Sequence, residues 1–459
     1  MKNTSRLMDI IDRAYNGPPC DERDFDMNYV ARGVARVVKA YDITFDKTKI
    51  IQQDDPMIDR LWEAALDFLE ECGVYNTSTS RRMTFTRLEI EEFLKHTPTE
   101  VTIGEGTDAR LQVRRDVEDE RPPIIIGGPI GTPLSEELYL PIMQSYIQEP
   151  LVDTVTTGTL ETTMGREPRT RSPLEVIAAW QEVELLFAAA RRAGRPGMGF
   201  GAVQMAISEI GHLTAINQGG GYRPTDWQMI AMISEMKTNS DLLIKTAHSV
   251  MTNGVLHSFY NPILGGYGGG EEGLAVLITA GVTAMQLIYM ATTHCTAPVS
   301  PTISADTIPQ ILRAVSAGVT ALSRHTPLMV DVMTSSVAGP GTAMLLHETL
   351  AISTMATVCG AARLMGPRSA MGIHLNHVTG LESRFKGEVG HAAAGLSRER
   401  ADEILQKVVA QYEPYLNDGP VGQPFDALYD VATVRPNADW LDIYARVKEQ
   451  AAEWGLAFK

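Results

Sequence analysis

The chain has 459 residues, a formal net charge of −16 and a sequence pI of about 5.1. Hydrophobic residues make up 44% and charged residues 21%, which is typical of a globular protein with a large core. An acidic surface disfavours nucleic acid, because phosphate binding needs a basic footprint, and it disfavours an anionic membrane for the same reason.

The cysteines and the N-terminal sequence indicate a cytoplasmic protein. The four cysteines lie far apart and form no CxxC pair, which is typical of reduced thiols and not of a disulfide framework. Asp9 and Asp12 interrupt the first apolar stretch, so we expect no secretory signal. We also expect no membrane span, since we find no uncharged apolar run of about 18 residues.

Residues 1–123 are predicted to form an N-terminal helical region. Apolar residues recur at spacings of three and four in Asp59–Tyr75, with Gly73 as the expected stop. A second helix is predicted to start near Thr86 and Leu88. The charged segment Arg114–Pro123 is predicted to be a loop or an edge hairpin.

From Ile124 onward, short apolar runs alternate with helical stretches. The runs predicted as strands are Ile124–Pro129, Leu151–Gly158, Arg195–Gly201, Leu242–His248, Gly254–Leu264, Ala284–Ala291, Pro327–Thr334 and Ala362–Pro367. One amphipathic stretch between them begins at Ser172, with Pro173 at the first helical position and Glu175 placed as in a capping box.

This alternation predicts a parallel α/β sheet, and eight units in about 250 residues favour a (β/α)8 TIM-like barrel over an open sheet. We place the barrel at residues 124–396 and a C-terminal helical extension, packed on the barrel, at 397–459. A doubly wound sheet would need a G-x-G-x-x-G turn. The glycine-rich stretch Gly265–Gly273 has other spacing and indicates a mobile loop or a close backbone contact.

Several segments carry a resemblance that spans nearly the whole chain. They are Leu69–Tyr75, Gly127–Glu137, Arg171–Ala179, Ala193–Gly201, Gly265–Glu272, Ala338–Pro340, Gly380–Val389 and Tyr429–Pro436. In this order they resemble the corrinoid-dependent monomethylamine methyltransferase family. The resemblance implies a (β/α)8 barrel that forms homo-oligomers. It also implies methyl transfer to the Co(I) corrinoid of a separate partner protein, with the protein positioning the methyl donor.

The chain departs from this family where the amine is handled. The family's pyrrolysine position falls on Gly201, and an acidic residue shortly after it falls on Gln204. A second family glutamate falls on Phe259, and a polar family residue falls on Met333. We therefore expect a homologue without pyrrolysine that does not demethylate monomethylamine by the family's route.

A donor without a free amine lone pair needs no adduct with pyrrolysine, so we expect a quaternary ammonium compound or, alternatively, a methyl ether or thioether. Phe259 or Tyr260 would offer an aromatic face to an N-methyl cation, although strand alternation lets only one of them face the barrel interior. Gly201 would leave space for the donor, and Gln204 would hydrogen-bond a carboxylate or an ether oxygen of it. The alternatives are that Phe259 and Met333 only fill the pocket and that Gln204 only solvates the rim.

Three further residues are candidates for the site. His248, at the end of a predicted strand, is a candidate general acid–base because its usual pKa lies near neutrality. Asp331 would be costly to bury alone, so it either pairs with a cation or faces the site. Arg363 is its candidate partner or, alternatively, a clamp for the carboxylate of a betaine-like substrate.

Zinc and loss of catalysis remain alternatives. We expect no metal site, because neighbouring His294 and Cys295 would point to opposite faces of a strand and only His374 and His377 have a ligand-like spacing. Zinc-dependent transfer from an ether or thioether is kept open. So are a non-catalytic paralogue that binds the corrinoid protein and a barrel enzyme of unrelated chemistry such as a lyase.

Overall fold

Eight parallel strands close into a barrel in the computed structural model, which describes residues 2–201, 208–217, 219 and 221–458. The strands around the barrel are β10 (Trp227–Met232), β12 (Val255–Tyr260), β13 (Thr293–Thr296), β14 (Val330–Ser335), β15 (Arg363–Arg368), β5 (Ile124–Gly127), β7 (Thr154–Thr156) and β9 (Gly199–Gly201). The predicted (β/α)8 barrel is confirmed.

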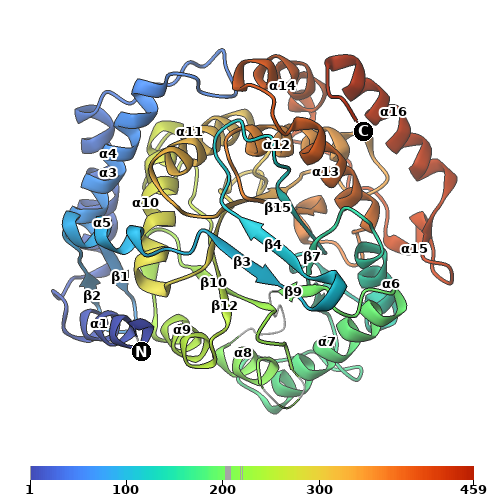
Figure 1. Ribbon diagram of the computed structural model, residues 1–459, viewed down its shortest axis with the longest axis horizontal. Coiled ribbons are helices and arrows are strands. Elements are labelled where there is room, and N and C mark those ends of the chain that lie inside the picture. Colours follow the sequence, from blue (N-terminus) through green and yellow to red (C-terminus); the bar gives the residue numbers. More distant parts are fainter. Residues whose placement is uncertain (1, 202–207, 218, 220, 459) are drawn as a thin grey trace.

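A ring of helices surrounds the strands (Figure 1). Its members are α6 (Glu136–Ile147), α7 (Pro173–Arg192), α8 (Glu209–Ala215), α9 (Ser240–Thr252), α10 (Glu271–Tyr289), α11 (Pro309–His325), α12 (Ala343–Val358) and α13 (Gly380–Ala393). Their inward faces and the outward faces of the strands form one continuous hydrophobic core. A smaller cluster inside the barrel includes Ile126, Trp227, Phe259, Met333 and Met365.

Six of the eight predicted strands overlap a barrel strand, and two are wrong. Leu242–His248 lies in α9, because the side chain of Asn239 accepts a hydrogen bond from the Leu242 amide at 2.9 Å and starts a helix. Ala284–Ala291 covers the end of α10. The strands that we missed are β10 and β13. A short apolar run fits a buried helix as well as a buried strand, and both errors have this origin.

Helix α10 corrects the expectation that no long uncharged apolar run exists. It is 19 residues long and apolar enough to cross a membrane, but 94% of it is buried inside the protein. It packs against α4 (Asp55–Cys72) and α11. Burial on all sides explains why its apolar residues do not follow a stripe.

The N-terminal region contains helices on one side of the barrel (Figure 1). As predicted, Gly73 stops α4 as the residue that caps its C-terminus, and Thr86 caps the next helix with Glu89 in a reciprocal capping box. The remaining elements here are α1 (Lys2–Asn16), α2 (Glu22–Asp24), the π-helix η1 (Phe25–Ala31), α3 (Arg32–Ala40), α5 (Arg87–Lys95), β1 (Val74–Asn76) and β2 (Arg81–Met83).

A hairpin that the sequence did not reveal closes the amino-terminal end of the barrel. Strands β3 (Glu100–Ile103) and β4 (Arg110–Val113), joined through the 3-10 turn η2 (Gly106–Asp108), lie across the middle of the helix ring (Figure 1). Ile103 packs in the cluster inside the barrel, and Gln112 Oε1 accepts a hydrogen bond from Arg363 at 3.0 Å. This hairpin leaves the carboxyl ends of the strands as the accessible end.

The chain ends in helices, as predicted. Helices α14 (Arg398–Tyr412) and α16 (Ala438–Trp454) pack on α12. The smaller elements are β6 (Pro133–Leu134), β8 (Thr159–Leu160), β11 (Lys237–Thr238), η3 (Ser369–Gly372), η4 (Glu413–Tyr415), α15 (Phe425–Leu428), β16 (Tyr429–Asp430) and β17 (Arg435–Pro436). The division at residues 123 and 396 stays a prediction, since helices from all three parts share one core.

Two local predictions have different outcomes. Helix α7 begins at Pro173 as expected, but the capping box is wrong: Glu175 accepts hydrogen bonds from the Ser208 amide and hydroxyl at 2.7 and 2.8 Å. The close backbone contact in the glycine-rich stretch is confirmed, because a Cβ on Gly273 would lie 1.8 Å from the carbonyl oxygen of Gly268.

Candidate active site

A cavity of about 350 Å³ opens at the carboxyl ends of the barrel strands. Its described lining residues come from strand ends and the loops that follow them: Ile130, Gly131, Thr159, Met229, Ala231, Phe259, Asn261, Met333 and Arg368. Barrel enzymes of this architecture carry their active sites at this end, and cavities of about 300–1,000 Å³ are typical of small-molecule sites. We therefore take this cavity as the candidate active site.

Two of the predicted site residues, Phe259 and Met333, line this cavity together. Phe259 is 8% exposed and Met333 is 3% exposed, and both belong to the apolar cluster inside the barrel. Tyr260 is turned the other way, toward α10, where a Cβ on Gly281 would lie 2.3 Å from its ring. Strand alternation thus excludes Tyr260 from the cavity, which corrects its assignment as a substrate contact.

The space expected at Gly201 is already filled. The indole of Trp227 crosses from β10 over β9, so a Cβ on Gly201 would lie 1.9 Å from two of its ring atoms. Its Nε1–H donates to Thr154 Oγ1 on β7 at 2.9 Å. Gly201 therefore makes room for Trp227 and not for a donor. Gln204 lies outside the described residues.

Asp331 and Arg363 pair deep inside the barrel, as predicted. Arg363 Nε donates to Asp331 Oδ2 at 2.7 Å, and Arg363 Nη2 donates to the same oxygen and to His257 Nδ1, the latter at 2.6 Å. All three residues are 0% exposed. Burial raises the pKa of Asp331 to about 6 against the opposing effect of Arg363, and burial lowers the pKa of His257 well below its usual value.

This buried pair changes two predicted roles. Neither Asp331 nor Arg363 lines the cavity, because both belong to the layer nearer the amino-terminal end, next to Gln112 of the hairpin. Arg363 has its counter-ion in Asp331, so it is not free to clamp a substrate carboxylate. The geometry assigns both residues to the barrel core and does not support a catalytic role for Asp331.

The predicted acid–base residue His248 is also misplaced. It lies on α9 in the outer layer, and its ring packs edge-to-face on His212 at 6.2 Å between centroids. Burial lowers the pKa of His248 from its usual value. It follows no barrel strand and does not line the cavity, so it is not placed to move a substrate proton.

The histidine and cysteine pairs do not assemble into a metal site. His294 Nδ1 and Ser258 Oγ are hydrogen-bonded at 2.8 Å, whereas Cys295 packs inside the barrel, so these neighbours occupy opposite faces as predicted. His374 and His377 face each other at 5.3 Å in a loop. Over the described part of the chain, no group of three or more histidine, cysteine or acidic residues could hold a metal ion.

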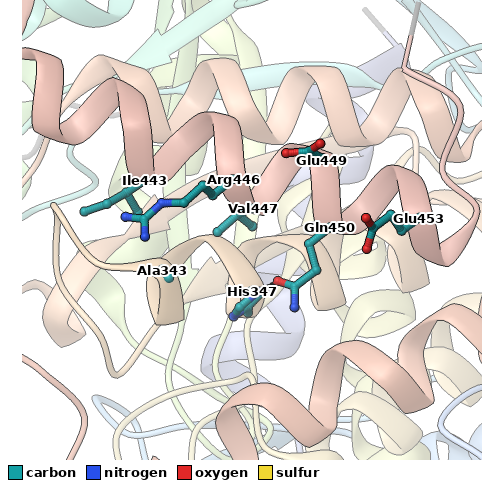
Figure 2. Close-up of a pocket in the computed structure, with 8 residues that line it drawn as sticks. All are labelled: Ala343, His347, Ile443, Arg446, Val447, Glu449, Gln450 and Glu453. Carbon is teal, nitrogen blue, oxygen red and sulfur yellow. Dashed lines mark hydrogen bonds between the residues drawn. The ribbon is translucent and has the colours of Figure 1, made fainter.

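A second cavity, of about 400 Å³, lies on the outside of the protein between α12 and α16 (Figure 2). His347 Nε2 and Gln450 Oε1 are 2.8 Å apart there, and Arg446, Glu449 and Glu453 project from α16. No barrel strand ends in this groove. We therefore attribute it to helix packing and not to catalysis.

Four residues that line the cavity were not predicted, although a pattern in the sequence could have revealed them. Met229 and Ala231 alternate with outward residues along β10, a strand that we did not predict. Asn261 lies near the end of the predicted strand Gly254–Leu264 and directly follows β12, and Arg368 directly follows the predicted strand Ala362–Pro367; a barrel places its functional residues at such strand ends. Trp227 gave no signal, since only the fold brings its indole over Gly201.

Comparison with known proteins agrees with this geometry. The model of the family "Monomethylamine methyltransferase MtmB" matches residues 6–456. Monomethylamine methyltransferase MtmB2 of Methanosarcina acetivorans is 33% identical over 100% of this chain and 99% of its own length. Monomethylamine methyltransferase MtmB of Methanosarcina mazei is 32% identical, with 98% of each chain covered.

Solved structures show the same likeness in three dimensions. The crystal structure of the Methanosarcina barkeri monomethylamine methyltransferase superimposes with a TM-score of 0.96 at 32% identity, over 98% of both chains. The hydroxylamine MtmB complex gives the same TM-score, identity and coverage. With a family match over almost the whole chain, the protein belongs to the monomethylamine methyltransferase MtmB family and is a corrinoid-dependent methyltransferase.

Proposed function

We propose that this enzyme transfers a methyl group from a small donor without a free amine lone pair, foremost a quaternary ammonium compound, to the Co(I) corrinoid of a cognate partner protein. The observation that carries the proposal is the pair of Gly201 and Trp227. At the position where the family resemblance puts pyrrolysine, this chain has a glycine, and an indole covers it.

The lining of the cavity supports a donor that needs no activation by adduct formation. Among its described residues there is no lysine, no carboxylate and no histidine, so none can form an imine or protonate an amine. A quaternary donor needs neither step. Its methyl carbon accepts the electron pair of Co(I), the carbon–nitrogen bond breaks, and the pair from that bond stays on nitrogen as the lone pair of a tertiary amine.

The apolar wall of the cavity suits N-methyl groups. Phe259 offers an aromatic ring, and Met229 and Met333 add polarisable sulfur atoms. A ring face attracts a methylated cation by about 0.5–2 kcal/mol, more when water is excluded. These side chains would hold the methyl group toward the open end of the barrel, where the partner's corrinoid must approach.

The remaining expectations belong to the same proposal. We propose a cytoplasmic homo-oligomer that receives a separate corrinoid protein at the carboxyl ends of the strands. Zinc-dependent transfer from an ether or thioether finds no support in the ligand geometry described above. If the protein is instead a non-catalytic paralogue, no donor should give methyl-cobalt in the following experiment.

The test is a spectral assay of methyl-cobalt formation on a reduced corrinoid protein, with quaternary ammonium compounds, methyl ethers and methylamines as donors. We expect a signal with a quaternary donor and none with monomethylamine. Phe259→Leu should raise the donor KM about two- to thirtyfold, because it removes one cation–π contact. The matched control Tyr415→Leu, at an aromatic residue 60% exposed on η4, should leave KM unchanged.

Two results would contradict the proposal. Turnover of monomethylamine would show that an amine lone pair is handled without pyrrolysine. Absence of methyl-cobalt formation with every donor, from protein that still shows a cooperative unfolding transition, would favour the non-catalytic paralogue.

A further inference from the structure

Arg368 in the active-site cavity has no counter-ion among the residues that the structure describes. Arg368 ends β15, is half-buried and lines the cavity together with Phe259 and Met333. Among the described residues, its guanidinium has neither an ion pair nor a hydrogen-bond acceptor. Because Arg368 is only half-buried and lines the open cavity, water can solvate its guanidinium until a ligand anion takes that place.

The surroundings hold Arg368 in place without neutralising it. Gly372, at φ +66°, lies so close that a Cβ there would be 2.2 Å from Arg368 Nε, so the backbone of η3 packs against the guanidinium. The carboxyl group that acts electrostatically on Arg368 is Asp306, whose Oδ1 accepts a hydrogen bond from the Ser335 amide at 2.7 Å. Burial raises the pKa of Asp306 well above its usual value, which favours its neutral form.

The residues outside the described part cannot supply the missing side-chain carboxylate. Positions 1, 202–207, 218, 220 and 459 contain no aspartate or glutamate. The cavity therefore combines one uncompensated positive charge with an apolar, aromatic wall. A bare quaternary cation would be repelled by this charge, whereas a zwitterion would satisfy both sides.

We propose that Arg368 determines specificity by pairing with a carboxylate on the methyl donor, so that the substrate class is a betaine: an N-methylated ammonium group and a carboxylate in one small molecule. This rests on the proposed function for the identity of the methyl group. Arginine binds carboxylates in a two-point fork, which would fix the orientation of the donor with its ammonium end toward Phe259.

The experiment is isothermal titration of the full-length protein, without any corrinoid protein, with matched ligands. Glycine betaine and two homologues with longer spacers are compared with choline and tetramethylammonium. We expect at least one betaine to bind about 10–100-fold more tightly than choline, which has the same cationic end and no carboxylate. Arg368→Gln should remove this preference, and Arg368→Lys should retain part of it.

Arg446→Gln on α16 is the matched control, an exposed arginine in the outer groove, and should not change the preference. Equal affinity of wild-type protein for betaine and choline would overturn the inference even if a variant failed to fold. So would a preference that persists in Arg368→Gln, or binding by none of the betaines.

The two proposals fail separately. Arg368-dependent betaine binding without methyl-cobalt formation would contradict the proposed function and still support this inference. Methyl transfer from tetramethylammonium as fast as from a betaine would support the proposed function and contradict this inference.

Discussion

Replacing Gly201 by alanine tests the central feature of the site, the indole that lies over this glycine. The new methyl group would lie 1.9 Å from Cδ2 and Cε2 of Trp227, far inside van der Waals contact. Overpacking of this kind costs about 1–3 kcal/mol. The indole is held in this position, because it donates a hydrogen bond to Thr154 and packs edge-to-face on His257 with 5.0 Å between the ring centroids. Loss of that hydrogen bond adds about 1 kcal/mol.

We therefore expect Gly201→Ala to lower the free energy of unfolding by about 2–4 kcal/mol. Trp227→Ala alone should cost about 3–5 kcal/mol through the cavity that it leaves. In the double variant the alanine methyl group meets empty space, so the two costs should not add. A coupling free energy of about 2 kcal/mol or more is expected, against about 0.5 kcal/mol for independent sites.

The assay is urea unfolding of the wild-type protein, both single variants and the double variant, followed by tryptophan-independent far-UV circular dichroism. Gly270→Ala is a matched control: a Cβ there meets only the flexible end of Glu272, at 3.6 Å, so a cost under about 1 kcal/mol is expected. Additive costs for Gly201 and Trp227 would refute the placement of the indole and, with it, the argument about the pyrrolysine position.

Two more predictions concern the barrel interior. Arg363→Met should lower the free energy of unfolding by about 3–5 kcal/mol, because it leaves Asp331 buried at 0% exposure without its partner. The double variant Asp331→Leu, Arg363→Met should lose less, because it removes both charges. Equal losses for the single and the double variant in urea unfolding would contradict this. Burial, with Arg363 acting in the same direction, lowers the pKa of His294 to about 3. The unfolded chain therefore binds the extra proton, and stability falls by about 1.4 kcal/mol per unit as pH drops from about 6.5 toward 3. His294→Gln should flatten the difference curve over this range, and parallel wild-type and variant curves would show that His294 does not titrate this way.

Local patterns predicted the elements whose signals are contained in a few neighbouring residues. Gly73 and Thr86 mark helix ends by backbone conformation and capping, both of which act within one turn. The alternation of strands and helices was strong enough to predict the barrel even though two strands were wrong. Strand parity likewise separated Phe259 from Tyr260, because side chains alternate faces with a period of two.

Long-range contacts decided the rest of the site. The Asp331–Arg363 pair was foreseeable because buried charges need partners, but its depth beneath the cavity follows from the β3–β4 hairpin, which local patterns did not reveal. His248 was assigned to a rim because its segment was read as a strand. That reading failed since buried helices and strands share an apolar composition.

What the sequence by itself determined is the barrel and the family, both of which depend on residue identity and spacing; that the family's amine-handling residues are replaced stays a prediction of the same kind. Only the tertiary structure decided that Gly201 is covered by Trp227, 26 residues later in the chain. It also brought Arg368, without a counter-ion among the described residues, to the same cavity as Phe259. Occupied volume and charge compensation depend on which distant side chains meet, and closure of the barrel brings them together.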